Sequence, residues 1–199
     1  MSSLLIVKKL ALPIILILIA LYYFAGSSNP PLIFPDPKTS EYSLPYPSGL
    51  KYELFQTYCE NSGHRNRLAY DFEMPIGAEI TASRSGVVTV VENSFSDEDH
   101  TTGHNNRVVI RHADESLAWY AHLKQGSIIV NPNDSVNVGQ KIGECGNSGR
   151  TGSVPHLHFE VFREHLYNYS DAIPISFNNL MGKLDTSGML VSGEWYQSK

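Results

Sequence analysis

Polar and apolar positions alternate strictly over residues 156–161, where histidine, histidine and glutamate interleave with leucine, phenylalanine and valine. Because successive side chains of a β-strand point to opposite faces, the pattern predicts a strand with its three polar side chains on one face. These are His156, His158 and Glu160. The apolar face can bury itself in a core, so the strand holds two imidazoles side by side. Such a pair suits metal binding or proton transfer, and two partly exposed structural histidines are the alternative.

Short β-forming runs, separated by turns rich in glycine and asparagine, follow one another from about residue 50. The predicted strands are residues 78–83, 86–92, 107–112, 117–123, 127–130, 141–144 and 156–162, with 173–175 as a last edge strand. No long amphipathic helical pattern occurs among them. Many short strands at regular spacing predict an all-β, antiparallel sandwich or barrel-like fold.

The N-terminal part of the chain has a different pattern. Residues 10–25 are almost wholly apolar and follow Lys8 and Lys9, which predicts a hydrophobic helix that is either a signal peptide or a membrane anchor. Sixteen helical residues span about 24 Å, somewhat less than a hydrocarbon core of about 30 Å. In both cases we expect the rest of the chain to be exported.

Six of the eleven prolines fall in residues 27–49, which favours an extended linker over a helix. The predicted division of the chain is therefore a signal peptide or membrane anchor at 1–26, a linker at 27–49, a folded domain at 50–177 and a C-terminal tail at 178–199.

Composition narrows the range of functions. The 199 residues are 42% hydrophobic and 18% charged, with a formal net charge of -5, which is ordinary for a globular protein. Because no basic block occurs, we expect no nucleic-acid partner. The two cysteines, Cys59 and Cys145, exclude a disulfide scaffold and leave open whether they pair or stay as buried thiols.

A hydrolytic zinc site needs three protein ligands and a position for water, so the histidine pair requires partners. Asp71 lies between Tyr70 and Phe72, on the face that the alternation assigns to Ala69 and Glu73. A carboxylate in such an aromatic run is costly unless it is paired or bound to a metal. A surface carboxylate on a half-exposed strand is the alternative.

His122 ends the predicted strand 117–123, where alternation places it on the face of Ala118 and Tyr120. The small alanine leaves room for a ligand or substrate, and a structural histidine at a strand end is the alternative. Apart from His64, the remaining four histidines are expected at the surface or as hydrogen-bonding neighbours of the site. These are His100, His104, His112 and His165.

Five motifs occur in a fixed order along residues 50–177. They are His64 with Asp71, Tyr120-Ala121-His122-Leu123, Val138-Gly139-Gln140-Lys141-Ile142-Gly143, Gly146-Asn147-Ser148-Gly149 and His156-Leu157-His158-Phe159-Glu160-Val161. In these motifs the chain resembles the lysostaphin/LytM-type zinc metallopeptidases. The resemblance implies an antiparallel LytM-type fold (duplicated hybrid motif, barrel-sandwich) with a narrow groove.

The resemblance also implies roles for five residues. His64, Asp71 and His158 would bind zinc, and His122 and His156 would be the catalytic histidines. We expect one of these two to act as the base and the other to donate to the oxyanion, and the sequence leaves open which does which. The chain departs from many relatives in having six residues instead of three between His64 and Asp71. We interpret the extra residues as a wider loop, with Glu60 or Glu73 as the alternative ligand.

The predicted function is therefore hydrolysis of peptide bonds in peptidoglycan stems or cross-bridges by a zinc metalloendopeptidase. The expected partners are a peptidoglycan peptide and, if the N-terminal segment is uncleaved, the membrane. The chain would face the periplasm or cell wall, or be secreted after cleavage. A non-catalytic regulator of a cell-wall amidase is the alternative. A cupin-like metal site fits less well, because it expects a glutamate several residues after the second histidine, and Glu160 is only two away.

Overall fold

The computed structural model describes residues 32–58, 63–65 and 67–199, and residues 33–199 form one compact unit. The predicted signal peptide or anchor, together with Cys59 and Glu60, lies outside the described residues. Within the described part of the chain, no helix has the length and apolar character needed to cross a membrane.

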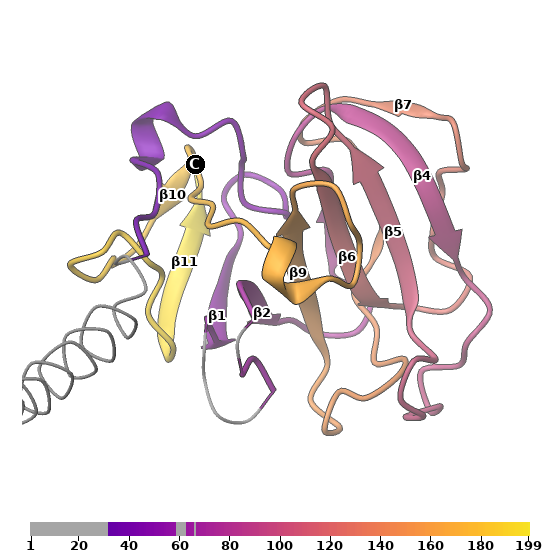
Figure 1. Ribbon diagram of the computed structural model, residues 1–199. Coiled ribbons are helices and arrows are strands. Elements are labelled where there is room, and N and C mark those ends of the chain that lie inside the picture. Colours follow the sequence, from indigo (N-terminus) through magenta and orange to yellow (C-terminus); the bar gives the residue numbers. More distant parts are fainter. Residues whose placement is uncertain (1–31, 59–62, 66) are drawn as a thin grey trace, which may run out of the picture. The chain divides into compact units, whose positions relative to one another are not determined.

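Two antiparallel sheets make up the fold (Figure 1), which confirms the predicted all-β class. The larger sheet has nine strands in the order β10-β11-β1-β2-β9-β6-β5-β4-β7, and the smaller one pairs β3 with β8. The bounds are β1 Lys51–Gln56, β2 Ala69–Glu73, β3 Glu79–Thr81, β4 Gly86–Glu92, β5 Asn106–Arg111, β6 Leu117–Leu123, β7 Ser135–Val136, β8 Lys141–Glu144, β9 His156–Phe162, β10 Leu180–Met181 and β11 Glu194–Ser198. Two single-turn 3-10 helices, η1 Pro37–Thr39 and η2 Tyr169–Asp171, complete the elements.

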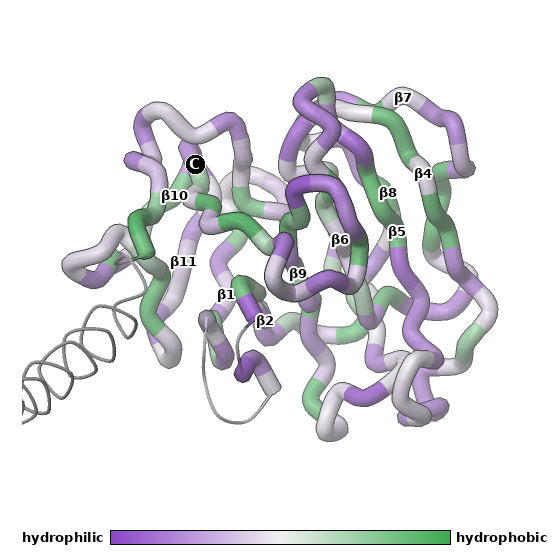
Figure 2. Tube along the Cα trace, viewed as in Figure 1, coloured by the Kyte–Doolittle hydropathy of each residue, from purple (hydrophilic) through white to green (hydrophobic). Residues whose placement is uncertain are grey.

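Strands with clear alternation or valine-rich runs lie where the sequence predicts them, notably β4, β6, β8 and β9. In Figure 2 much of β4 is coloured hydrophobic, as its four valines require. Two predicted strands are wrong. Residues 127–130 and 173–175 do not form strands, although Ile129 N–H donates to Ile142 O at 3.1 Å and Ile173 N–H donates to Val161 O at 2.9 Å. Each segment makes only isolated backbone hydrogen bonds to the adjacent strand, which are too few to form a β-ladder.

The core lies on the face of β9 that carries Leu157, Phe159 and Val161, all fully buried. Aromatic rings from neighbouring segments pack there, with ring centroids of Phe159 and Phe177 5.9 Å apart and those of Tyr120 and Phe159 5.0 Å apart. Burial of one such side chain is worth about 1.5–3 kcal/mol. This apolar face therefore anchors β9 in the middle of the sheet.

Residues outside the predicted domain 50–177 also pack into the compact unit. Tyr42, Leu44 and Tyr46, from the Pro-rich region, are buried, and the Tyr46 hydroxyl donates to the backbone oxygen of Tyr196 in β11 at 2.8 Å. Proline forbids a regular helix there but leaves an extended chain free to bury aromatic side chains. The C-terminal segment supplies β10 and β11, which pair with each other and, through β11, with β1.

The register of four neighbouring strands sets one row of side chains across the sheet. Asp71 of β2 is opposite His158 of β9, His158 is opposite Ala121 of β6, and Ala121 is opposite Arg107 of β5. Because paired residues share a face, the row places a carboxylate, an imidazole and a guanidinium on the face opposite the aromatic core.

Candidate metal centre

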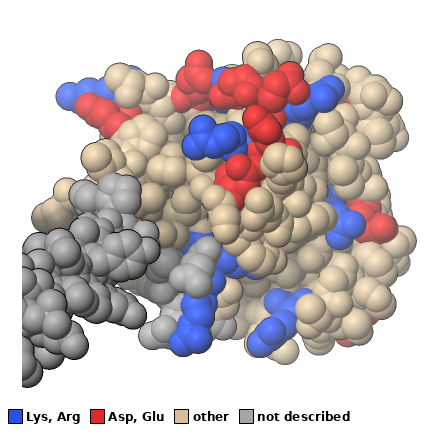
Figure 3. Space-filling view, viewed as in Figure 1, with Lys and Arg blue, Asp and Glu red and all other residues tan. Residues whose placement is uncertain are grey.

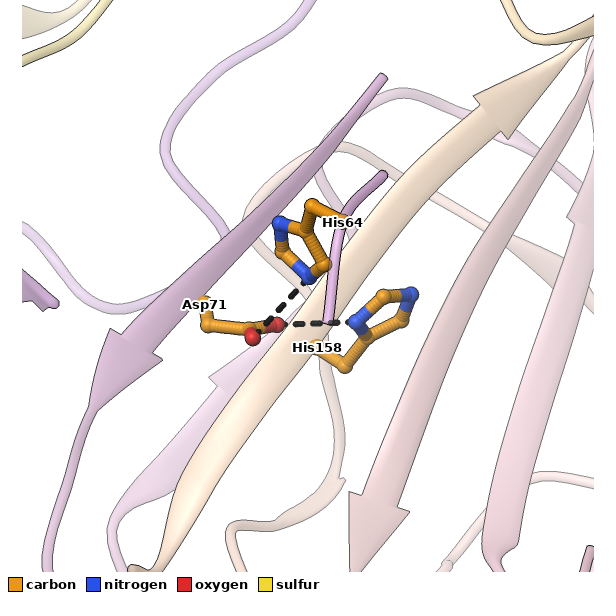
Figure 4. A group of neighbouring side chains, drawn as sticks. All are labelled: His64, Asp71 and His158. Atoms are coloured by element: carbon orange, nitrogen blue, oxygen red, sulfur yellow. Dashed lines mark hydrogen bonds and ion pairs between the residues drawn. The ribbon is translucent and has the colours of Figure 1, made fainter. Parts of the chain in front are cut away.

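Three of the predicted site residues meet at one point. Asp71 Oδ1 lies 2.8 Å from His158 Nδ1, and Asp71 Oδ2 lies 3.0 Å from His64 Nε2 (Figure 4). The three side chains come from β2, from β9 and from the loop before β2, and all are buried. One ligand atom from each lies within 4.8 Å of the others, and this is the one such group found among the described residues.

The hydrogen bonds of His64 leave a lone pair aimed at the carboxylate. His64 Nδ1 lies 2.9 Å from the carbonyl of Thr57, so it must carry the hydrogen and donate. In the neutral ring, Nε2 is then an acceptor, and it faces another acceptor, Asp71 Oδ2. A cation or a proton between them removes that conflict. Two imidazole nitrogens and a carboxylate oxygen form the donor set that zinc takes in hydrolytic sites, so these residues can hold such an ion.

Two further residues surround the outer nitrogen of His158. Glu160, only 1% exposed, has Oε2 at 2.6 Å from Arg67 NH2 and 3.4 Å from His158 Nε2. Arg67 NH2 also lies 2.8 Å from His158 Nε2. Burial opposes ionisation of Glu160, but His158 and Arg67 outweigh it and lower the pKa of that carboxyl. Glu160 is therefore a buried anion beside the three converging residues, and its place on the histidine face of β9 follows from the alternation.

His156 and His122 lie beside the three converging residues with a shared hydrogen-bond arrangement. His156 Nδ1 donates to Val154 O and His122 Nδ1 donates to Ser148 O, each at 2.7 Å. Nε2 of each neutral ring is then a free acceptor. The two ring centroids are 4.7 Å apart, and His156 Nε2 is 3.8 Å from Asp71 Oδ1. All five residues singled out from the sequence are thus brought together.

The backbone of His122 departs from regular strand geometry. Its φ is 63°, and the β5–β6 register shifts at this point, so that Asn106 pairs with Leu123 while Arg107 pairs with Ala121. The predicted face of His122 is wrong as a result. Strict alternation puts the ring with Tyr120 on the core side, whereas the bulge and the left-handed φ turn it to the side of Ala121 and His158.

Burial and mutual charge separate these residues into two kinds. Burial, reinforced by His156 and His158, lowers the pKa of His122 to about 3, and burial also lowers the pKa of His156. Burial opposes the charged forms of Asp71 and His158 too, but their attraction outweighs it. The pKa of Asp71 is held well below its usual range and that of His158 is raised. His122 and His156 are therefore neutral imidazoles, as proton acceptors must be.

These side chains line one part of a groove of about 750 Å³. Residues that the sequence analysis missed line the rest. They are chiefly Arg67, Arg107, Trp119, Arg150, Thr151, Tyr167 and Tyr169. Trp119 could have been predicted from the sequence, because alternation in β6 places it on the same face as Ala121. The arginines had no such signal, because an isolated arginine in a strand or turn is ordinarily a surface residue.

The remaining histidines and the alternative ligand lie elsewhere. His100, His104 and His165 are exposed. His112 is buried, not at the surface, and its Nδ1 donates to Ser85 O at 2.9 Å, away from the groove. The exposed Glu73 is not part of the converging group.

Comparison with known proteins matches residues 65–170, just over half of the chain, to peptidase family M23. The peptidoglycan DD-endopeptidase ShyA of Vibrio cholerae is 40% identical over 91 residues, which are 46% of this chain and 19% of ShyA. The lipoprotein NlpD of Yersinia enterocolitica is 34% identical over 85 residues, 43% of this chain and 77% of NlpD. The chain thus spans about a fifth of the length of ShyA but most of NlpD.

Among solved structures, a catalytic-domain mutant of the prophage-encoded M23 protein EnpA from Enterococcus faecalis has the same fold, with a TM-score of 0.50 at 24% identity. The match covers 66% of this chain and 93% of that one. With the family match extending over more than half of its length, the chain belongs to peptidase family M23.

Proposed function

We propose that the protein is a zinc metalloendopeptidase that hydrolyses peptide bonds in the stems or cross-bridges of peptidoglycan. The observation that carries the proposal is the convergence of His64, Asp71 and His158, with the neutral rings of His122 and His156 beside them. The substrate class is supported by relatives that are named peptidoglycan endopeptidases, ShyA among them.

His64 Nε2, a carboxylate oxygen of Asp71 and His158 Nδ1 are the proposed zinc ligands. When bound, zinc would polarise the scissile carbonyl and lower the pKa of a water molecule from 15.7 toward about 7. The Nδ1–H bond from His64 to Thr57 fixes the tautomer that leaves Nε2 free for the metal. Without the metal, Arg67 NH2 donates to His158 Nε2 and Nδ1 donates to Asp71. With Nδ1 as a ligand the hydrogen must lie on Nε2, where Glu160 Oε2, 3.4 Å away, can accept it once Arg67 turns from that nitrogen to Glu160 alone.

His122 and His156 are the proposed catalytic residues. Both present a free Nε2, because both Nδ1 hydrogens are donated to backbone carbonyls. One of the two rings would take a proton from the attacking water at Nε2. The other would take up a second proton from solvent at Nε2, favoured by the developing negative charge, and donate it in a hydrogen bond to the oxyanion. Such positioned proton transfer contributes typically 10²–10⁴-fold to a rate.

The experiment combines metal analysis with digestion of purified peptidoglycan. His122→Ala and His156→Ala should keep about one zinc per chain and lose muropeptide release. Asp71→Ala and His158→Ala should lose the metal as well. His104→Ala, at an exposed site, serves as the matched control. Loss of zinc in His122→Ala or His156→Ala would show that the roles are misassigned.

The same measurements separate the enzyme from a non-catalytic regulator of an amidase. A zinc-loaded wild-type protein that releases no muropeptides, and whose addition instead increases the activity of an amidase, would establish the regulator. Product masses that correspond to peptide-bond cleavage, abolished by chelator, would establish the endopeptidase.

We also propose that the compact unit is exported, with residues 1–26 as signal peptide or anchor. The NlpD relative is named a lipoprotein. Fractionation of cells that produce the full chain, followed by mass measurement of the mature protein, tests this. A full-length product in the cytoplasmic fraction would contradict it.

A further inference from the structure

The groove is lined by positive charge in a protein of negative net charge. Three arginines line it, of which Arg67 is paired with the buried Glu160, whereas Arg107 and Arg150 have no ion pair among the described residues; Asp71 is the one carboxylate among the described lining residues, although the whole chain carries a formal charge of -5. On the face that Figure 3 draws, acidic side chains form a band along the upper edge and several basic ones lie below it. The groove therefore favours an anionic occupant, beyond what a zinc site needs.

Several donors of this groove have no hydrogen-bond partner among the residues that the structure describes. Arg107 Nε, Trp119 Nε1 and Thr151 Oγ1 are buried and make no hydrogen bond among the described residues. Trp119 is 5% exposed and Thr151 6% exposed, and all three residues line the groove. An unsatisfied buried polar group costs about 1–3 kcal/mol, so these groups are suited to a ligand rich in acceptor oxygens.

Arg107 is the central member of this set. It belongs to the row that contains Asp71 and His158, two strands away from His158, which at about 4.8 Å per strand is roughly 10 Å. Its cross-strand neighbour on the other side, Glu92, has Oε1 engaged by the backbone N–H groups of Asn93 and Ser94. No ion pair within 4.0 Å joins Arg107 to a described carboxylate. Its NH1 donates to Asn105 Oδ1 at 3.2 Å, and its Nε makes no hydrogen bond among the described residues.

We infer that Arg107, with Trp119 and Thr151 as further unpartnered donors of the same groove and the exposed Arg150 in its lining, provides a subsite for a free carboxylate of the peptide substrate. The inference rests on the proposed function and adds to it the class of peptide. About 10 Å corresponds to roughly three extended residues, so the carboxylate lies within about three residues of the bond that is cut. Directly cross-linked stem peptides with free carboxylates fit this subsite, whereas an uncharged oligoglycine bridge leaves its donors unpaired.

The test compares two versions of one ligand. A directly cross-linked stem-peptide dimer with free carboxylates, and the same dimer with its carboxylates converted to amides, are titrated calorimetrically into chelator-treated protein, where hydrolysis cannot interfere. The wild-type protein should bind the carboxylate form at least about tenfold more tightly, as for a charged hydrogen-bonded pair worth about 1.4 kcal/mol or more.

Arg107→Gln should abolish this preference, and Arg107→Lys, which keeps the charge but not the fork, should restore part of it. Arg111→Gln is the matched control, because Arg111 is an arginine of the same strand that is half exposed and lies outside the groove lining. Thr151→Val, which removes one donor without touching β5, keeps the test decisive if Arg107→Gln fails to fold.

Equal binding of the two dimers by the wild-type protein, or an unchanged preference in Arg107→Gln and Thr151→Val, would overturn the inference. The proposed function is judged separately, by cleavage of either dimer by the zinc-loaded protein. If the protein cleaves both dimers equally, the proposed function is supported and the inferred subsite is refuted. If the protein cleaves neither dimer but still binds the carboxylate form more tightly, the inferred subsite is supported and the proposed function is refuted.

Discussion

His122 combines a functional position with an uncommon backbone conformation. A non-glycine residue with φ of 63° is disfavoured by about 1–2 kcal/mol, although histidine and asparagine adopt it more readily than most residues. Its ring reaches the site only through this conformation. The backbone at the end of β6 therefore holds a small strain that places the imidazole 4.7 Å from His156.

Replacement of His122 by asparagine should separate strain from chemistry. Because asparagine tolerates a left-handed φ, His122→Asn should change the melting temperature less than His122→Ala does, while both lose hydrolysis. Thermal unfolding followed by circular dichroism measures the melting temperature, and muropeptide release measures hydrolysis. Equal melting temperatures for the two variants would show that the conformation is unstrained.

Glu160 should affect metal affinity without touching the metal. Glu160→Gln removes the charge that pairs with Arg67 and that can accept the Nε2–H of His158, and such partners typically contribute 10–100-fold to affinity. Competition with a chromophoric chelator measures the zinc dissociation constant. Glu164→Gln, at an exposed position, is the control. An unchanged zinc affinity in Glu160→Gln would contradict this role.

His112 should make stability depend on pH. Burial lowers the pKa of this side chain below 6.5, so the folded protein favours the neutral ring. The unfolded chain then binds more protons below pH 6.5, and the free energy of unfolding should fall as the pH drops below that value. Urea unfolding of the wild type and of His112→Gln, both in chelator at pH 7.5 and 5.5, measures this. The pH dependence should be smaller in His112→Gln.

At the scale of the elements, the strands that carry the site were predictable and the edges of the sheet were not. The alternation of β9 and the aromatic run of β2 fix their faces, because one side of each must be buried. Residues 127–130 have the same β-forming character but lack a continuous partner. β10 and β11 have weak patterning and still pair, because β11 meets the free edge of β1.

The Pro-rich segment before β1 should prove necessary for stability. A fragment of residues 50–199 lacks Tyr42, Leu44 and Tyr46, which are buried in the folded unit, whereas a fragment of residues 33–199 retains them. Loss of three such side chains removes several kcal/mol, and 1 kcal/mol shifts the melting temperature by about 2–4 °C at this size. We expect residues 50–199 to melt at least roughly 10 °C lower in differential scanning calorimetry. Equal melting temperatures of the two fragments would show that the Pro-rich segment is not needed for stability.

At the scale of the whole molecule, the proposed metal centre joins segments that are far apart in sequence. His64 and Asp71 precede His158 by about ninety residues, since Asp71 and His158 are 87 residues apart. An ion bound only by the folded form stabilises it by RT ln(1 + [L]/Kd), about 4.1 kcal/mol at a thousandfold excess over Kd. The stability of the compact unit should therefore depend on zinc.

Chelation should lower the melting temperature of the wild-type protein by about 8–16 °C, and added zinc should restore it. Magnesium should not, because it prefers all-oxygen ligands and a larger coordination number. Asp71→Ala should show no response to either treatment. A melting temperature that is the same with and without chelator would argue against a bound zinc at this centre.

The sequence alone determined the all-β class and the central strands and predicted the five residues that the structure brings together, because a β-strand buries every second side chain and the motifs name the polar residues between them. The tertiary structure decided which residues meet. It turned His122 to the site face against strict alternation, buried Glu160 against Arg67, and aligned Arg107 with His158 across two strands. These placements depend on register and on a bulge between strands, which are set by packing between distant segments and leave no local pattern in the chain.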